Sequence, residues 1–358
     1  MESEGNAVSG AVSLEVGTVV EGRWRVERLL GEGGCGTVYQ VIDQTKATRA
    51  ALKAERLQRA KDDEVLRMEV KILQKLANKP HVCRLHTFGK TSQFNFMVVS
   101  LLSYSIQQLR RHCPERRFTT QTANSLALQC LRAINNLHDI GYVHRDIKPA
   151  NFALGRQSRR TVYMFDFGLA RQYQVVSRDG VKMMREPRLD VPFRGTLTYC
   201  SLNVHRRMEQ GRHDDLWSLL FMTIELIRGA LPWRGYGTDE TKQLKETIND
   251  RSLLTNCPTE YFGILKHLKK LCYVDRPNYA WIELQLNCVT ARKRHDPKAP
   301  FDWEPGGRFY TNFRTLPGLN ETDFKESDTF ETSSEDKDRR LTPSTDNLPE
   351  PNPKKDTR

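Results

Sequence analysis

Four residues in two short stretches could carry out phosphoryl transfer. Asp146, Lys148 and Asn151 fall within six positions, and Asp166 follows the first of them by twenty positions. A phosphoryl group in transfer depends on positioning and on nearby cations, with little covalent work for the protein. Asp146 can accept the proton of an attacking hydroxyl, and Lys148 can neutralise the moving phosphate. Asn151 and Asp166 can supply the oxygen ligands that Mg²⁺ prefers, so all four are candidate catalytic residues.

The two stretches are His144–Asn151 and Asp166–Gly168. His-Arg-Asp alone is often surface charge and Asp-Phe-Gly alone is often a turn, but both at this spacing favour a catalytic site. They resemble the catalytic loop and the metal-binding loop of protein kinases. Lys148 lies two residues after Asp146, as in the catalytic loop of serine/threonine kinases. Tyrosine kinases lack a lysine at this position. The resemblance implies an α+β, bilobal fold with ATP between a small β-rich N-lobe, which holds one key helix, and a larger, mainly helical C-lobe.

A glycine-rich stretch, Gly31–Gly36, lies between two runs of β-forming residues. It lacks the Lys-Ser or Lys-Thr ending of a Walker loop, so it predicts a flap between two strands, although an ordinary hairpin turn uses glycines too. Glycines let a backbone approach phosphates closely. Cys35 stands where kinases usually carry an aromatic residue. The resemblance makes the following residues nucleotide-binding: Gly31, Glu32, Gly33, Gly34, Cys35, Gly36 and Val38.

A helix is predicted from Asp63 to Leu76, and Glu69 falls on its apolar stripe. A carboxylate on a buried face needs a cationic partner, because burying it unpaired is costly. Lys53, which ends an apolar strand, is the candidate partner of Glu69. The alternative is that Glu69 lies at the surface and pairs with Arg67 or Lys71. The resemblance implies that the lysine and the glutamate position the phosphates of ATP.

The stretch Phe94–Leu102 is an apolar strand that resembles the hinge between the kinase lobes. Val99 corresponds to the residue that guards the pocket behind the adenine, and Leu101 and Leu102 would present backbone groups to the base. The resemblance adds Ala51 and Ala153 to the predicted nucleotide-binding residues.

A long irregular segment runs from Gly168 to Ser201. Loops of this length inside a domain are usually functional, and the resemblance implies an activation segment. Near its end, Thr196 corresponds to the threonine whose hydroxyl braces the catalytic aspartate and lysine. A buried helix is predicted from Gly211 to Leu226. Within it, Asp215 resembles the kinase aspartate that anchors the backbone of the catalytic loop, and a role for Asp214 and Asp215 in complementing the helix dipole is compatible with this.

Ser201–Asn203 stands in place of the usual Ala-Pro-Glu and is close to the Ser-Ile-Asn of the casein kinase 1 group. Within that group the tau-tubulin kinases are the most similar branch, and the resemblance covers about Val16 to Glu304. It is carried by Met68–Val70, His81–Arg84, Asn151–Ala153, Gly211–Leu219, Leu231–Arg234 and Phe301–Glu304.

One departure concerns the choice of substrate. Casein kinase 1 relatives place an anion-binding arginine two residues after the Gly-Thr of the activation segment, where this chain has Thr198. Arg185, Arg188 and Arg194 keep positive charge in the same loop, but without the fixed bidentate fork. We therefore expect acidic or phosphate-primed substrates, with weak dependence on any one primed position.

The charge is unevenly distributed. The net charge is +12, and the residues from Leu316 to Arg358 carry −4, which leaves +16 on residues 1–315. A basic fold favours acidic or phosphorylated protein substrates, which the resemblance extends to cytoskeletal proteins. No zinc-finger spacing or basic-aromatic repeat points to nucleic acid, and a monomer is expected.

We expect a flexible N-terminal arm over 1–18, a kinase domain over 19–304 and a disordered acidic tail over 305–358, with the N-lobe at about 19–101 and the C-lobe at about 103–304. The tail could dock on the basic domain and inhibit it, or be inert. Eight cysteines without metal-ligand spacing, and no signal peptide or long apolar run, predict a reduced, soluble protein without a membrane span, in the cytoplasm and also the nucleus.

Three functions remain open at this stage, and the least favoured, nucleic-acid binding by the basic fold, predicts an affinity for DNA or RNA that depends steeply on salt. The first is an active serine/threonine kinase that uses ATP and Mg²⁺, favoured because every residue of the expected catalytic set is present. The second is a pseudokinase or scaffold that keeps the fold and binds nucleotide and protein partners. Phosphate transfer by the purified protein would distinguish them.

Overall fold

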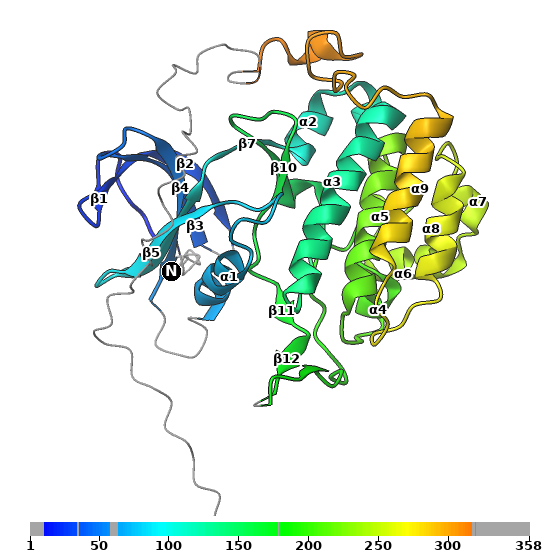
Figure 1. Ribbon diagram of the computed structural model, residues 1–358, viewed down its shortest axis with the longest axis horizontal. Coiled ribbons are helices and arrows are strands. Elements are labelled where there is room, and N and C mark those ends of the chain that lie inside the picture. Colours follow the sequence, from blue (N-terminus) through cyan, green and yellow to red (C-terminus); the bar gives the residue numbers. More distant parts are fainter. Residues whose placement is uncertain (1–10, 34–35, 58–63, 178, 317–318, 320–358) are drawn as a thin grey trace, which may run out of the picture. The chain divides into compact units, whose positions relative to one another are not determined.

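The computed structural model describes residues 11–33, 36–57, 64–177, 179–316 and 319. Residues 19–100 are built on an antiparallel sheet whose six strands follow the order β1-β2-β3-β4-β6-β5. These strands are β1 (Val19–Val20), β2 (Trp24–Gly33), β3 (Gly36–Asp43), β4 (Arg49–Arg56), β5 (Leu85–Lys90) and β6 (Phe94–Ser100). A single helix, α1 (Glu64–Lys75), accompanies them (Figure 1).

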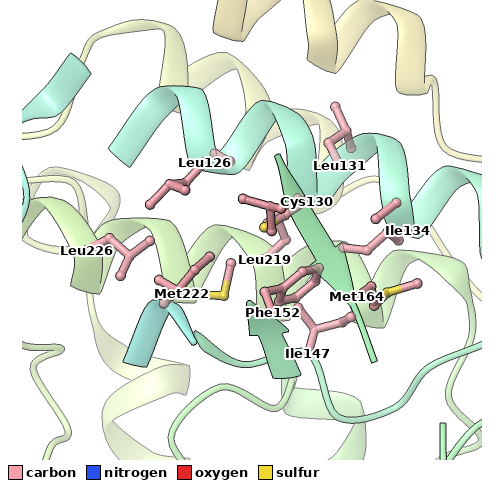
Figure 2. Close-up of a cluster of buried hydrophobic side chains, with 14 of the residues drawn as sticks. Leu126, Cys130, Leu131, Ile134, Ile147, Phe152, Met164, Leu219, Met222 and Leu226 are labelled. Atoms are coloured by element: carbon pink, nitrogen blue, oxygen red, sulfur yellow. The ribbon is translucent and has the colours of Figure 1, made fainter. Parts of the chain in front are cut away.

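From residue 106 onward, helices make up most of the regular secondary structure (Figure 1). They are α2 (Ile106–His112), α3 (Thr120–Asp139), α4 (Leu202–His205), α5 (Arg212–Arg228), α6 (Thr238–Thr247), α7 (Asp250–Leu253), α8 (Glu260–Leu268) and α9 (Tyr279–Arg292). Figure 2 shows the core between α3 and α5, in which Leu126 and Ile134 of α3 face Leu219 and Met222 of α5. The predicted β-rich lobe with one helix and the larger helical lobe are confirmed.

Short strands carry the stretches that the sequence marks as chemical. β7 (Leu102–Ser105), β9 (Phe152–Gly155) and β10 (Val162–Met164) form one small sheet, and β8 (Tyr142–Val143) pairs with β11 (Arg171–Gln172). The predicted catalytic loop therefore leaves one small sheet at β8 and enters the other at β9. Pairing at both ends limits how far the loop can shift.

The segment from Gly168 to Ser201 is more regular than expected. Besides β11, it contains a hairpin of β12 (Gln174–Val176) and β13 (Lys182–Met184). The prediction of an irregular segment throughout was wrong here, because neither strand has an apolar alternation long enough to stand out in the sequence.

Part of the predicted N-terminal arm is packed against the sheet. Tyr39 donates its hydroxyl hydrogen to the Val12 carbonyl at 2.6 Å, and the Leu14 amide donates to the same hydroxyl oxygen at 2.9 Å. Val12 joins a small core with Tyr39 and Leu52 on one face of the sheet. The prediction of a flexible arm over residues 1–18 was therefore wrong for residues 11–18. Residues 1–10 lie outside the described part.

The predicted disordered tail likewise begins too early. Phe313 lies in a short 3-10 helix, Tyr310–Phe313, and is fully buried, and Leu319 is nearly so. Both belong to the main hydrophobic core of the domain. Order thus continues beyond residue 305, and the rest of the tail, with its expected docking, lies outside the described residues. Within the described ranges, no helix is long and apolar enough to cross a membrane.

Candidate active site

One face of the six-stranded sheet carries four of the predicted nucleotide-binding residues. Val38 in β3 lies opposite Lys53 in β4, and Ala51 lies opposite Val99 in β6. Residues two apart in a strand share a face, and so do directly opposed residues of neighbouring strands. The register therefore places all four side chains on the face opposite to the Tyr39 and Leu52 core.

The predicted pair of Lys53 and Glu69 is present. The lysine ammonium donates a hydrogen bond to a carboxylate oxygen of Glu69, which is 1% exposed. Burial raises the pKa of this carboxyl, and the charge of Lys53 opposes that rise. Arg67, the surface partner considered from the sequence, lies on the exposed side of α1. The same lysine nitrogen lies 3.7 Å from Asp166 Oδ1, so it joins the sheet to the metal-binding loop.

The glycine stretch forms the predicted flap between two strands. β2 and β3 pair antiparallel up to Gly33 and Gly36, and Glu32 lies opposite Thr37, whereas Gly34 and Cys35 lie outside the described residues.

Two kinds of glycine occur in the flap. Gly36 has φ +112°, and a side chain there would meet the Ala54 carbonyl oxygen at 2.5 Å, so the fold itself requires glycine. A Cβ built on Gly31 or Gly33 would meet nothing within 4 Å. The protein's own packing does not require glycine at those two positions. The open space suits the close approach of phosphate groups, which fits ATP.

Buried side chains fix the catalytic loop from below. Ile147 and Phe152 are 1% and 0% exposed and point into the core between α3 and α5 (Figure 2). Their polar neighbours gather above that core. Lys148 Nζ donates to Asp146 Oδ2 at 2.6 Å, and Asn151 Nδ2 donates to the Asp146 carbonyl oxygen at 2.9 Å. Three of the four candidate catalytic residues are therefore in direct contact.

The fourth candidate is held differently. Asp166 has φ +64°, a conformation that non-glycine residues adopt rarely and mostly at functional sites. Among the described residues its buried Oδ1 atom has no hydrogen-bond partner, with the ammonium of Lys53 3.7 Å away. Because the amide nitrogen of Asn151 is engaged by Asp146, its amide oxygen is the end that can bind a cation. These oxygens fit a hard divalent metal.

Of the two residues that Thr196 was predicted to brace, the structure shows its contact with Asp146. Its hydroxyl donates to Asp146 Oδ1 at 2.6 Å. The preceding Gly195 has φ +114°, and a side chain there would lie 2.6 Å from the Arg145 carbonyl oxygen. Glycine at this position therefore lets the activation segment come close enough for the threonine to reach the aspartate.

Asp215 anchors the catalytic loop as predicted. Its carboxylate accepts hydrogen bonds from the backbone nitrogens of His144 and Arg145 at 2.7 and 2.8 Å, and lies 2.8 Å from His138 Nε2. Burial alone would raise its pKa, but the bonds from the histidine and the loop hold the pKa below its ordinary value. The anchor therefore stays ionised.

The remaining predicted residues lie in the small sheet below. Leu102 of β7 is opposite Gly155 of β9, and Ser105 is opposite Ala153. Ala153 is buried, and Leu102 is half-buried. The two strands thus bring the predicted hinge next to the residue expected beneath the nucleotide.

One cluster was missed from the sequence. The buried Glu209 carboxylate lies 2.5 Å from Arg188 Nε and 3.3 Å from Arg171 Nε. Nearby, burial and the neighbouring arginines lower the pKa of Arg145 to about 10. Arg188 was expected to offer its charge to substrates, but this charge is paired with Glu209 instead. No spacing rule links residues 21 positions apart in irregular chain.

Comparisons with known proteins agree with this geometry. A family model for the protein kinase domain matches residues 24–280. A Dictyostelium discoideum protein, provisionally named a serine/threonine-protein kinase, is 37% identical over 297 residues, which are 82% of this chain and 59% of that protein. The chain thus matches less than two thirds of that relative's length.

Two Caenorhabditis elegans proteins are similar over most of their length. One, provisionally named a serine/threonine-protein kinase, is 38% identical over 302 residues, covering 83% of this chain and 86% of that protein. The other, provisionally named a casein kinase I, is 34% identical over 306 residues, covering 81% and 86%.

The fold and the site define a protein kinase domain. The chain belongs to the protein kinase family, and its domain and relatives place it in the serine/threonine class. Membership implies ATP-dependent phosphoryl transfer to protein substrates with the help of a divalent metal.

Proposed function

We propose that this chain is an active serine/threonine kinase that transfers the γ-phosphate of ATP to hydroxyl groups of proteins. One observation carries the proposal: the carboxylate of Asp146 is bound on one oxygen by Thr196 and on the other by Lys148, at 2.6 Å each. A carboxylate oriented in this way can accept a hydroxyl proton, while the lysine lies where it can neutralise the moving phosphate. A scaffold would not need this arrangement.

The nucleotide and metal roles follow from the same geometry. Gly31 and Gly33 leave room for phosphates, and the Lys53 and Glu69 pair supplies a fixed cation beside them. Asn151 and Asp166 would hold Mg²⁺, which would neutralise charge on the transferring phosphate. The other residues predicted from the resemblance to bind nucleotide are proposed to do so as well: Glu32, Gly34, Cys35, Gly36, Val38, Ala51, Val99, Leu102 and Ala153.

The test is phosphate transfer by the purified chain from radiolabelled ATP to casein or tubulin in the presence of Mg²⁺. We expect label on serine and threonine. Nucleotide binding without any transfer would favour the alternative, a pseudokinase or scaffold. Label on tyrosine alone would contradict the serine/threonine assignment.

We also propose that the chain belongs to the casein kinase 1 group, in the tau-tubulin kinase branch. Ser201 donates to Asp214 Oδ1 at 2.5 Å, and Asn203 Nδ2 donates to the same oxygen at 3.0 Å. The two polar residues of the motif thus close the activation segment onto α5. The similarity to a relative provisionally named a casein kinase I supports the group.

For substrates, we propose acidic or phosphate-primed proteins, including cytoskeletal ones, recognised by a monomeric kinase through diffuse attraction. Arg185 and Arg194 are exposed in the activation segment, whereas the charge of Arg188 is paired with Glu209. Thr198 is half-buried and provides no guanidinium fork. Exposed charges without a fixed fork attract acidic segments with little demand on position.

The corresponding test is a peptide series with phosphoserine at successive positions before the acceptor. The natural protein should discriminate weakly between positions, and Thr198→Arg should sharpen the preference by about tenfold, because a bidentate contact contributes on the order of 1.4 kcal/mol or more. Sharp discrimination by the natural protein, with no gain in the variant, would contradict the proposal.

A further inference from the structure

Residues 195–201 lie directly beside the catalytic aspartate. Thr196 bonds to Asp146, so the residues that follow it border the space through which a substrate hydroxyl must reach the carboxylate. Thr198, in the middle of this segment, is half-buried and reachable from solvent. Any change in the path of residues 195–201 therefore changes where a substrate peptide can lie.

A single lysine on α6 binds this segment at two points. The Lys245 ammonium donates to the Leu197 carbonyl oxygen at 2.8 Å and to the Cys200 carbonyl oxygen at 2.7 Å. Its remaining hydrogen has an acceptor in His205 Nε2 at 3.3 Å. All three hydrogens thus have acceptors within the protein, and the residue is only 7% exposed.

The surroundings of Lys245 are built to hold a cation. Its nitrogen lies 5.5 Å from the ring centre of Phe221 and 5.3 Å from that of Trp233, distances at which aromatic faces attract a positive charge. Burying an ammonium is costly unless its hydrogen bonds are made, and here they are made to the backbone of the segment. If residues 195–201 moved away, the buried ammonium of Lys245 would lose these hydrogen bonds, so the lysine favours the observed position of the segment.

Other side chains reinforce the same segment. Trp233 Nε1 donates to the Thr198 carbonyl oxygen at 2.8 Å. The hydroxyl of Tyr199 donates to Glu225 Oε2 at 2.6 Å, and Glu225 is in turn paired with the buried Arg110 at 2.9 Å. Residues 197–200 are therefore each held from the helical part of the domain.

We propose that Lys245 is a positioning residue, which fixes residues 195–201 in the path that a protein substrate needs. The proposal rests on the kinase function proposed above. Because its hydrogens are all used within the protein, the lysine acts through the segment and does not bind the substrate itself. Its removal should affect neutral and acidic substrates equally.

The experiment compares Lys245→Met with the natural protein on one neutral and one acidic serine peptide. We expect kcat/KM to fall about tenfold for both peptides, through a higher peptide KM, while the affinity for ATP stays unchanged. Lys242→Met is the matched control, since it removes the same charge from the same helix at a half-exposed position. It should leave the neutral peptide unaffected.

Two results would overturn the proposal: unchanged peptide kinetics in Lys245→Met, or a loss confined to the acidic peptide, which would mean that the lysine binds substrate charge directly. Trp233→Phe, which removes the donor to Thr198 and keeps a ring, covers the case in which Lys245→Met does not fold. It should raise the peptide KM in the same direction, and an unchanged KM there would also overturn the proposal. If the natural protein phosphorylated neither peptide, the proposed function itself would fail.

Discussion

The catalytic loop and residues 195–201 meet at Asp146, yet they are held by neighbouring aspartates of the same helix. Asp215 of α5 binds the loop through the backbone nitrogens of His144 and Arg145. Asp214 binds the end of the other segment through the hydroxyl of Ser201. One turn of α5 thus fixes both the loop that carries the proposed proton acceptor and the segment proposed to position the substrate.

The two regions differ in how much of their support comes from within the region itself. The catalytic loop is supported mainly from within, by Lys148, Asn151 and the buried Ile147, with Asp215 added from α5. Residues 195–201 depend on side chains outside the segment, such as Lys245. Substitutions that loosen the first region should therefore lower the rate of the chemical step, and those that loosen the second should weaken productive binding of the protein substrate.

Among substitutions that disturb the support of one of the two regions, Asp215→Asn is expected to have the largest effect. An amide in place of the carboxylate turns a donor toward backbone nitrogens that need an acceptor, which should destabilise the fold by roughly 2 kcal/mol. We expect kcat to fall with the peptide KM nearly unchanged. Denaturant unfolding and steady-state kinetics would measure the two effects.

The matched control is Asp214→Asn on the preceding residue of α5. It should raise the peptide KM more than it lowers kcat, because its partner Ser201 ends the 195–201 segment and its partner Asn203 follows two residues later. If both variants changed the same kinetic constant in the same proportion, the two regions would not be supported independently.

A smaller effect is expected from pH. Burial lowers the pKa of Lys245 to about 8, although Cys200 opposes this shift. The lysine therefore carries its charge below pH 8 and loses it as the pH rises through 8, which weakens its bonds to the segment. Burial also raises the pKa of the Cys200 thiol and lowers the pKa of His205 to about 4. Neither of these two neighbours of Lys245 therefore changes its charge between pH 7 and pH 8.

The peptide KM of the natural protein should accordingly rise about threefold between pH 7 and pH 9, since a neutral donor forms weaker hydrogen bonds than a charged one. Lys245→Met should show no such rise. If the peptide KM depended on pH in the same way in both proteins, the charge of Lys245 would not control the position of the segment, and this prediction would be wrong.

Much of the site could be predicted because its chemistry is local in sequence. The contacts among Asp146, Lys148 and Asn151 need only a short loop, and the inward position of Glu69 follows from helical spacing alone. Cross-strand register then brings Lys53 to the same place.

What could not be predicted depends on packing between distant segments. The pairing of Arg188 with Glu209 joins irregular chain that has no periodic signal. Lys245 resembles any surface lysine of a polar helix until the fold surrounds it with rings and carbonyl oxygens. The same reason explains the misplaced ends: Val12 and Phe313 lie in stretches without a clear helical or strand period, and tertiary contacts bury them.

The most direct test of the central claim, that this site transfers phosphate, is the activity of Asp166→Ala beside the natural protein. Both would be given radiolabelled ATP, casein and a range of Mg²⁺ concentrations. Asp166 contributes a buried oxygen without a hydrogen-bond partner among the described residues, so its loss should remove the metal-dependent step. We predict transfer to serine and threonine by the natural protein and no detectable transfer by the variant. Full Mg²⁺-dependent transfer by Asp166→Ala would contradict the account.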